Sequence, residues 1–94
     1  MAEKCVEGKV IVVTGAGRGI GREIALLAAS QGAKVVVNDL GGSAEGDGRD
    51  LSVAQQVVAE ISKAGGAAVP NGDSVAEPQG AERIIKTAID WEPL

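Results

Sequence analysis

The segment Thr14-Gly15-Ala16-Gly17-Arg18-Gly19-Ile20-Gly21 has the composition of a turn that can approach a phosphate group closely. It follows the apolar run 10–13 and precedes an amphipathic segment that begins at Ile20. A strand that leads through a glycine-rich turn into a helix directs backbone N–H groups and the positive end of the helix dipole toward an anion. We therefore expect this turn to bind the pyrophosphate of a nucleotide.

The glycine spacing is Thr-Gly-x-x-x-Gly-x-Gly, because the sixth position counted from Gly15 is Ile20 and not glycine. A kinase-type phosphate loop requires Gly-Lys-Ser/Thr after the turn, and that sequence is absent here. A methyl-donor site usually has an acidic residue before the first glycine, where Val13-Thr14 stands. A tight connection that binds nothing is the remaining alternative, although so many glycines weaken the start of a helix.

Asp39 is a second candidate binding residue, 20 positions after Gly19 at the end of a predicted strand. A carboxylate there can accept hydrogen bonds from the hydroxyls of an adenosine ribose. It would repel a 2′-phosphate, so the sequence favours NAD over NADP, although Arg18 could help to hold a 2′-phosphate. The alternative is that Asp39 only caps the glycine-rich loop that follows it.

Asp73-Ser74-Val75 follows the third predicted strand, beside the expected position of an adenine. Ser74 with Glu77 three residues later also has the pattern of a helix N-cap. The two roles are compatible, because capping would hold the loop that lines an adenine pocket.

Strands and helices are expected to alternate with short connections. The predicted strands are 9–13, 34–38 and 67–70, and the predicted helices run from Gly19 to about Gln31, from near Ser52 to the Gly65-Gly66 pair, and from Ser74 onward. Residues 40–50 have a loop-like composition, and the last four residues fit no element.

Each predicted helix has an apolar face at helical spacing. These faces are Ile20, Ile24, Leu27 and Ala28, then Ala54, Val57, Val58 and Ile61, then Ala81, Ile84, Ile85 and Ala88. The β-α-β-α-β-α order predicts an α/β fold, the first half of a Rossmann-type doubly wound parallel sheet with strand order 3-2-1.

The bulk composition narrows the classes of function. Ninety-four residues allow one small domain, and a net charge of −4 argues against a nucleic-acid partner. With no histidine and a single cysteine, Cys5, a transition-metal site is not expected. The start has no apolar signal segment, and no apolar run is long enough to span a bilayer, so we expect a soluble cytoplasmic protein.

Through residues 14–21, Asp39 and Asp73, the chain resembles the short-chain dehydrogenase/reductase family. By this resemblance, the residues on the pyrophosphate side are Gly15, Arg18, Gly19 and Ile20. The resemblance also implies that Asp39 binds the adenosine ribose of NAD, and that Ser74 and Val75 border the adenine in the loop that Asp73 begins. The implied reaction is hydride transfer between a nicotinamide cofactor and a secondary alcohol or ketone.

The resemblance covers about residues 8–90, and over 35–42 it is similar to the hydroxyacyl-CoA dehydrogenase branch of multifunctional β-oxidation enzymes. Shorter matches to that branch are Gly65-Gly66, Asn71, Asp73-Ser74-Val75 and Thr87-Ala88-Ile89-Asp90. Trp91 keeps an aromatic position of the family, but 92–94 depart from its pattern. The catalytic Asn, Ser, Tyr and Lys of the family lie beyond that point, so no catalytic residue is assigned and the chain is expected to be inactive alone.

The leading hypothesis is thus that residues 1–94 are the N-terminal NAD-binding portion of a Rossmann-fold dehydrogenase whose full-length form is a homo-oligomer. The alternatives are a non-catalytic nucleotide-binding module and a fragment that binds nothing. Without a fourth strand, the strand 9–13 has an unpaired apolar edge, and we expect the isolated chain to self-associate or to be marginally stable. Light scattering that shows a monodisperse, cooperatively melting monomer would contradict this expectation.

Overall fold

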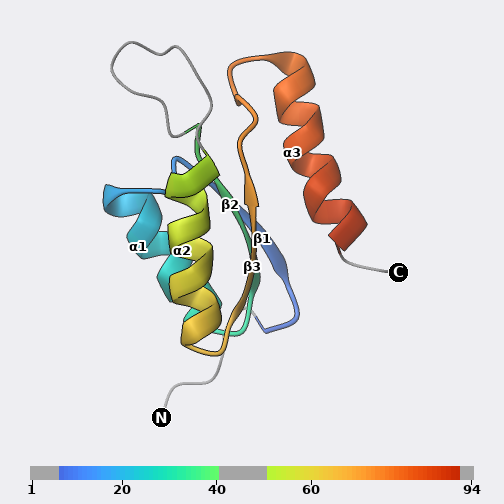
Figure 1. Ribbon diagram of the computed structural model, residues 1–94. Helices are drawn as coiled ribbons and strands as arrows, with labels where there is room; N and C mark the ends of the chain where they lie inside the picture. Colours follow the sequence, from blue (N-terminus) through green and yellow to red (C-terminus); the bar gives the residue numbers. More distant parts are fainter. Residues whose placement is uncertain (1–6, 41–50, 92–94) are drawn as a thin grey trace.

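The computed structural model describes residues 7–40 and 51–91 of the chain (Figure 1). Strands and helices alternate in the order β1 (Val10–Thr14), α1 (Gly19–Ser30), β2 (Lys34–Asn38), α2 (Leu51–Lys63), β3 (Ala67–Asn71) and α3 (Pro78–Trp91). The predicted element order is confirmed, and the strand bounds differ from the predicted ones by at most one residue. The predicted loop lies, except for Leu40, outside the described residues.

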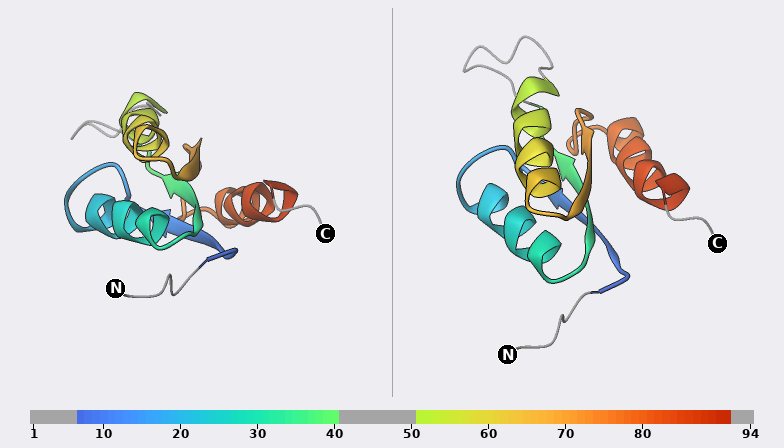
Figure 2. Two further views of the ribbon diagram at one scale, coloured as in Figure 1. Left: turned by 90° about the horizontal axis from the view of Figure 1, so that it is seen from below. Right: turned by 60° about the horizontal axis from the view of Figure 1, so that its bottom comes forward.

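The three strands form one parallel sheet with β2 at its centre. Helices α1 and α2 cover one face of this sheet, and α3 lies on the other (Figure 2). The α/β class and the strand order 3-2-1 are therefore confirmed. Among the described strands, β1 pairs with β2 alone, so its second edge is an edge of the sheet.

The core is built around the valines of β2, which are β-branched residues suited to a buried parallel strand. Val35, Val36 and Val37 have no exposed surface. Because side chains alternate along a strand, Val35 and Val37 point to the face covered by α1 and α2, and Val36 points to the face of α3. Burying each valine side chain contributes roughly 1.5–3 kcal/mol to the stability of the fold. This central strand therefore holds the loops at its two ends in place.

The predicted apolar face of α1 is largely wrong. The side chains of Ile20, Ile24 and Leu27 are 80%, 49% and 63% exposed, whereas Ala25 is fully buried against the sheet. Ala28, the fourth predicted member, does pack against the core. Successive helical residues are about 100° apart, so the helix is rotated by roughly one residue from the predicted orientation and approaches the sheet through small side chains.

The other two helix faces agree better with prediction. In α2 the predicted residues Ala54, Val57 and Ile61 are buried, and Val58 packs against the same core. In α3 Ile84 is buried as predicted, but Ile85 is 54% exposed.

The predicted capping boxes are wrong, since both helices begin elsewhere. Helix α2 begins at Leu51, which places Ser52 inside its first turn. Before α3, Ser74 Oγ accepts the N–H of Ala76 at 3.1 Å within a preceding turn. The N-cap is Glu77, whose carbonyl accepts the N–H of Ala81 at 2.9 Å, and proline at the first helical position suits its fixed φ.

The end of α3 is a further correction. Trp91 was expected to lie outside any element, but it is the last residue of α3 and is half-buried. Residues 92–94 lie outside the described part of the chain.

Candidate nucleotide-binding site

The glycine-rich turn after β1 is held in place by the end of β2. Ala16 is fully buried, and its N–H donates to the carbonyl oxygen of Asn38 at 2.9 Å. Gly15 and Gly19 have φ angles of +62° and +59°, in the left-handed region that favours glycine. A Cβ added at either position would meet no atom within 4 Å, so a ligand can approach the backbone of the turn there.

The first turn of α1 lies directly against this glycine-rich turn. A Cβ on Gly21 would stand 2.2 Å from the carbonyl oxygen of Gly15, so only glycine permits this approach. Arg18 is the N-cap of α1, without a side-chain capping bond, and the first helical turn has no acidic residue. The initial N–H groups, including those of Gly19 and Ile20, have no partner within the helix. Together with the uncompensated dipole they form a positive, anion-attracting end.

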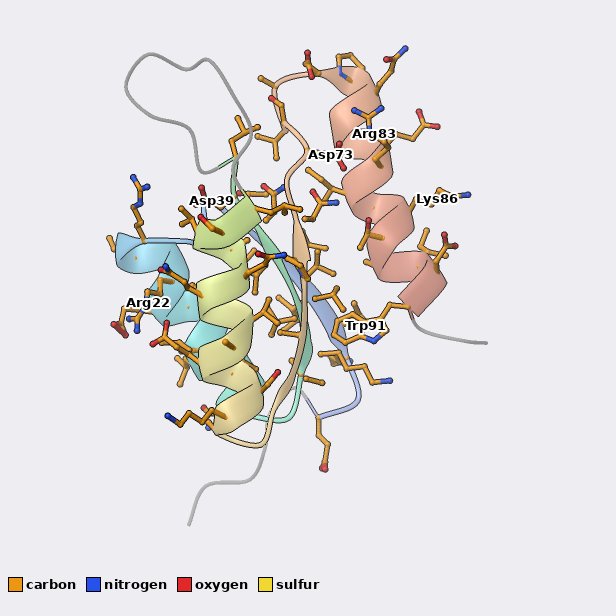
Figure 3. All side chains as sticks on the ribbon, viewed as in Figure 1. Arg22, Asp39, Asp73, Arg83, Lys86 and Trp91 are labelled. Carbon is orange, nitrogen blue, oxygen red and sulfur yellow. The ribbon has the colours of Figure 1, made fainter. Side chains whose placement is uncertain are left out.

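Asp39 lies against the turn that the sequence analysis linked with pyrophosphate. The N–H of Gly17 donates to Asp39 Oδ2 at 2.8 Å, and Figure 3 shows Asp39 beside the first turn of α2. A Cβ on Gly17 would lie 2.8 Å from this carboxylate oxygen and 2.2 Å from Val53 Cγ1 of α2. The absence of a side chain at Gly17 therefore allows the turn, the carboxylate and α2 to meet.

Two buried asparagines join the ends of β2 and β3. Asn38 and Asn71 are partners in the strand register and are only 3% and 7% exposed. Asn38 Nδ2 donates to Asn71 Oδ1 and to the carbonyl oxygen of Asp73, both at 2.8 Å. Asn71 Oδ1 also accepts the N–H of Asp73 at 2.9 Å. This arrangement fixes the first residues of the loop between β3 and α3.

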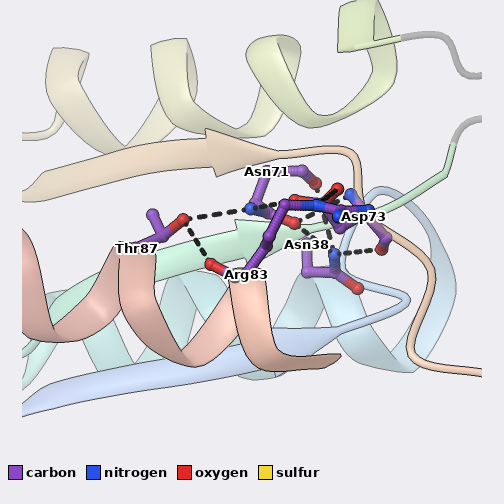
Figure 4. Close-up of polar contacts among 5 residues, drawn as sticks. All are labelled: Asn38, Asn71, Asp73, Arg83 and Thr87. Atoms are coloured by element: carbon purple, nitrogen blue, oxygen red, sulfur yellow. Dashed lines mark hydrogen bonds and ion pairs between the residues drawn. The ribbon is translucent and has the colours of Figure 1, made fainter. Parts of the chain in front are cut away.

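Helix α3 holds the same loop from its other side (Figure 4). Arg83 Nε donates to Asp73 Oδ1 at 2.8 Å, and this contact raises the pKa of Arg83 above its usual value. Asn71 Nδ2 donates to Thr87 Oγ1 at 3.2 Å, and the Thr87 hydroxyl donates to the carbonyl oxygen of Arg83 at 2.8 Å. The loop after β3 is thus tied to both neighbouring elements.

The structure brings the predicted site residues to one end of the sheet, because all three strands are parallel and their carboxyl ends adjoin. Direct contacts join Gly17 to Asp39 and Asn38 to Asp73. In the loop between β3 and α3, which we call the third loop, Ser74 is half-buried and Val75 is 54% exposed.

Four polar residues of this region were not predicted as site residues, namely Asn38, Asn71, Arg83 and Thr87. The sequence carries a partial signal for Asn38, a polar residue that ends a run of valines, but its pairing with Asn71 follows only from the strand register. No sequence pattern singles out Arg83, because its contact with Asp73 depends on the path of the loop between β3 and α3.

Comparisons with known proteins agree with this geometry. Residues 9–91 match the family model of the short chain dehydrogenases. A Mycobacterium tuberculosis protein described as a short-chain type dehydrogenase/reductase is 60% identical over 85 residues, which are 90% of this chain and 30% of that protein. The peroxisomal hydratase-dehydrogenase-epimerase of Saccharomyces cerevisiae is 58% identical over 81 residues, which are 86% of this chain and 9% of that protein.

A solved structure gives the same result for the fold. A 7α-hydroxysteroid dehydrogenase complexed with NADH and 7-oxo glycochenodeoxycholic acid aligns with a TM-score of 0.80 and 34% identity, over 94% of this chain and 31% of the other. The chain thus spans about a third or less of the length of each of these proteins. The family resemblance is confirmed, and the chain belongs to the short chain dehydrogenase family.

Proposed function

We propose that this chain holds the adenosine and pyrophosphate of NAD as part of a short-chain dehydrogenase. The observation that carries the proposal is the 2.8 Å hydrogen bond from the Gly17 N–H to the Asp39 carboxylate. This bond joins a carboxylate suited to ribose hydroxyls to a glycine-rich turn suited to phosphate. The two groups are thus neighbours at the carboxyl ends of β1 and β2, the edge of the sheet at which dinucleotides bind in folds of this type.

Each loop has a distinct proposed role. The pyrophosphate is bound at the start of α1 by Gly15, Arg18, Gly19 and Ile20. Since the Ile20 side chain is 80% exposed, its contribution comes from the backbone N–H. Asp39 accepts hydrogen bonds from the ribose, and the loop of Asp73, Ser74 and Val75 borders the adenine.

The charge of Asp39 favours NAD over NADP. An ionised carboxylate has about four acceptor positions, so the bond from Gly17 does not exhaust its capacity for hydroxyl donors. A 2′-phosphate at the same place would meet a like charge. Arg18 is the exposed basic residue in the turn that could offset this repulsion; we propose that the charge of Asp39 outweighs it.

The proposed reaction is hydride transfer between the nicotinamide and a secondary alcohol or ketone. When NAD is bound, it supplies the hydride chemistry, and this chain supplies binding and orientation. A 3-hydroxyacyl-CoA is the substrate that we favour, on the similarity to the peroxisomal hydratase-dehydrogenase-epimerase. The chain contains neither histidine nor tyrosine. We assign no catalytic residue to it and expect no dehydrogenase activity from these 94 residues alone.

Calorimetric titration with NAD and NADP tests the proposal. We expect NAD to bind at least about tenfold more tightly, which corresponds to about 1.4 kcal/mol of like-charge repulsion in the NADP complex. Equal affinities would contradict the role of Asp39. Failure of both dinucleotides to bind would contradict the whole nucleotide site.

Three broader expectations complete the proposal. We expect a cytoplasmic protein, no nucleic-acid partner, and a homo-oligomer for the full-length enzyme. None of the helices in 7–40 and 51–91 is long and apolar enough to cross a membrane. Fluorescence microscopy of the tagged protein tests the compartment, and a peroxisomal signal would overturn it. Binding of DNA or RNA at physiological salt would overturn the expectation of no nucleic-acid partner. A monomeric full-length enzyme would overturn the expectation of a homo-oligomer.

A further inference from the structure

The carboxylate of Asp73 is engaged by the protein itself. Arg83 Nε donates to Oδ1 at 2.8 Å, and Asn71 Nδ2 donates to Oδ2 at 3.1 Å. The Asp73 side chain is only 17% exposed. Both oxygens therefore serve to anchor the loop, and Asp73 does not have to contact a cofactor to matter for binding.

The backbone of Asp73 is held as well. Its N–H donates to Asn71 Oδ1, and its carbonyl accepts from the buried Asn38. Ser74 Oγ accepts the N–H of Ala76, which shapes the next turn. The main chain and both carboxylate oxygens of Asp73 are hydrogen-bonded. Asp73 therefore holds the backbone that leads into Ser74 and the exposed Val75 in one conformation.

Arg83 completes this arrangement from α3. Its side chain is half-exposed, and it has no role in the proposed pyrophosphate site. Thr87, one turn later, accepts from Asn71 and donates to the Arg83 carbonyl. Arg83 is the cation that links the start of α3 to the loop, through a charge-assisted hydrogen bond to Asp73.

We propose that Arg83 is a positioning residue for adenosine binding, which acts through Asp73 to hold Ser74 and Val75 against the adenine. The inference rests on the proposed function, because it assumes that the adenine lies beside this loop. By this inference, the affinity for the adenosine end of NAD depends on a contact made by α3, in addition to those of the glycine-rich turn and Asp39.

The test compares Arg83→Gln, Asp73→Asn and the double variant by calorimetric titration of the 94-residue chain with NAD. We expect each single change to raise the Kd about five- to tenfold, and the double variant to be no worse than either, because contacting residues act as one unit. Arg83→Lys, which keeps the charge, should stay within about threefold of the unchanged protein. Additive effects of the two changes would overturn the proposal.

Arg22→Gln is the matched control. Arg22 is also a partly exposed arginine in an ion pair between elements, with Glu60 of α2, and lies away from the third loop. We expect its Kd for NAD to equal that of the unchanged protein. An equal loss in Arg22→Gln and Arg83→Gln would overturn the proposal, because it would indicate a general effect on stability.

Amide hydrogen exchange gives a readout that does not depend on NAD. The N–H groups of Asp73 and Ala76 are hydrogen-bonded in the loop, so Arg83→Gln should speed their exchange at least about fivefold relative to the amides of α1. Unchanged loop exchange in both Arg83→Gln and Asp73→Asn would overturn the proposal. If the unchanged protein fails to bind NAD while loop exchange responds, the proposed function fails and the positioning of the loop by Arg83 stands.

Discussion

Replacing Asp39 with asparagine should weaken NAD binding about tenfold and remove most of the preference for NAD over NADP. A hydrogen bond to a charged group is worth about 1–1.5 kcal/mol more than a neutral one, and 1.4 kcal/mol corresponds to about tenfold in Kd. The amide keeps an oxygen for the Gly17 N–H, so the turn should hold its shape. NADP should bind as well as before or better, because the like charge near its 2′-phosphate is gone. Calorimetry with both cofactors measures the ratio of affinities.

Asp90→Asn is the control for this experiment. It makes the same change of net charge at an exposed residue of α3, whose carboxylate lies 4.0 Å from Lys86. The NAD-to-NADP ratio should not change in this variant. If the ratio of NAD to NADP affinity stayed the same in Asp39→Asn, or fell equally in Asp90→Asn, then Asp39 would not bind the ribose.

Gly21→Ala should destabilise the fold more than a methyl addition at the glycines of the preceding turn, Gly15, Gly17 and Gly19. The new Cβ would lie 2.2 Å from the Gly15 carbonyl oxygen and 2.9 Å from its carbon, both backbone atoms that cannot turn aside. Overpacking of this kind costs about 3 kcal/mol, which for a chain of this size lowers the Tm by more than about 10 °C. Thermal and urea unfolding followed by circular dichroism measure the loss.

Gly65→Ala separates the steric effect from backbone strain. Gly65 has a φ of +93°, but a Cβ there meets nothing within 4 Å. Its substitution should cost only about 1 kcal/mol for the left-handed conformation. If Gly21→Ala were no more destabilising than Gly65→Ala, then α1 would not approach the glycine-rich turn as closely as the structure has it.

The sheet could be predicted from the sequence because its signal is local. Residues 34–38 contain three β-branched valines between a turn and a polar residue, and the predicted strand matches β2. The helix rotation could not be predicted in the same way. Hydrophobicity gives most weight to large side chains such as Ile20 and Ile24. In the structure α1 instead approaches the glycine-rich turn through Gly21 and packs on the sheet through Ala25.

The polar network shows a second limit of the sequence. Ending the third strand at residue 70 instead of Asn71 concealed the pairing of Asn71 with Asn38, which the register of two parallel strands creates. Arg83 lies ten residues after Asp73 across a turn. Its contact depends on where α3 begins, and the capping pattern at Ser74 indicated the wrong start. The candidate residues of the glycine-rich turn and Asp39 were found because their spacing along the chain reflects the chemistry of one ligand.

A titration of the ¹⁵N-labelled chain with NAD, followed by amide chemical shifts, tests the central claim most directly. The account predicts that the largest shifts fall at Gly17 and Ile20 around the start of α1, at Asp39 after β2 and at Val75 in the loop after β3, and that they saturate together with one Kd. Adenosine diphosphate should reproduce most of them, since it carries the part of NAD that this chain is proposed to hold. Shifts confined to other surfaces, or none at NAD concentrations that saturate related dehydrogenases, would contradict the account.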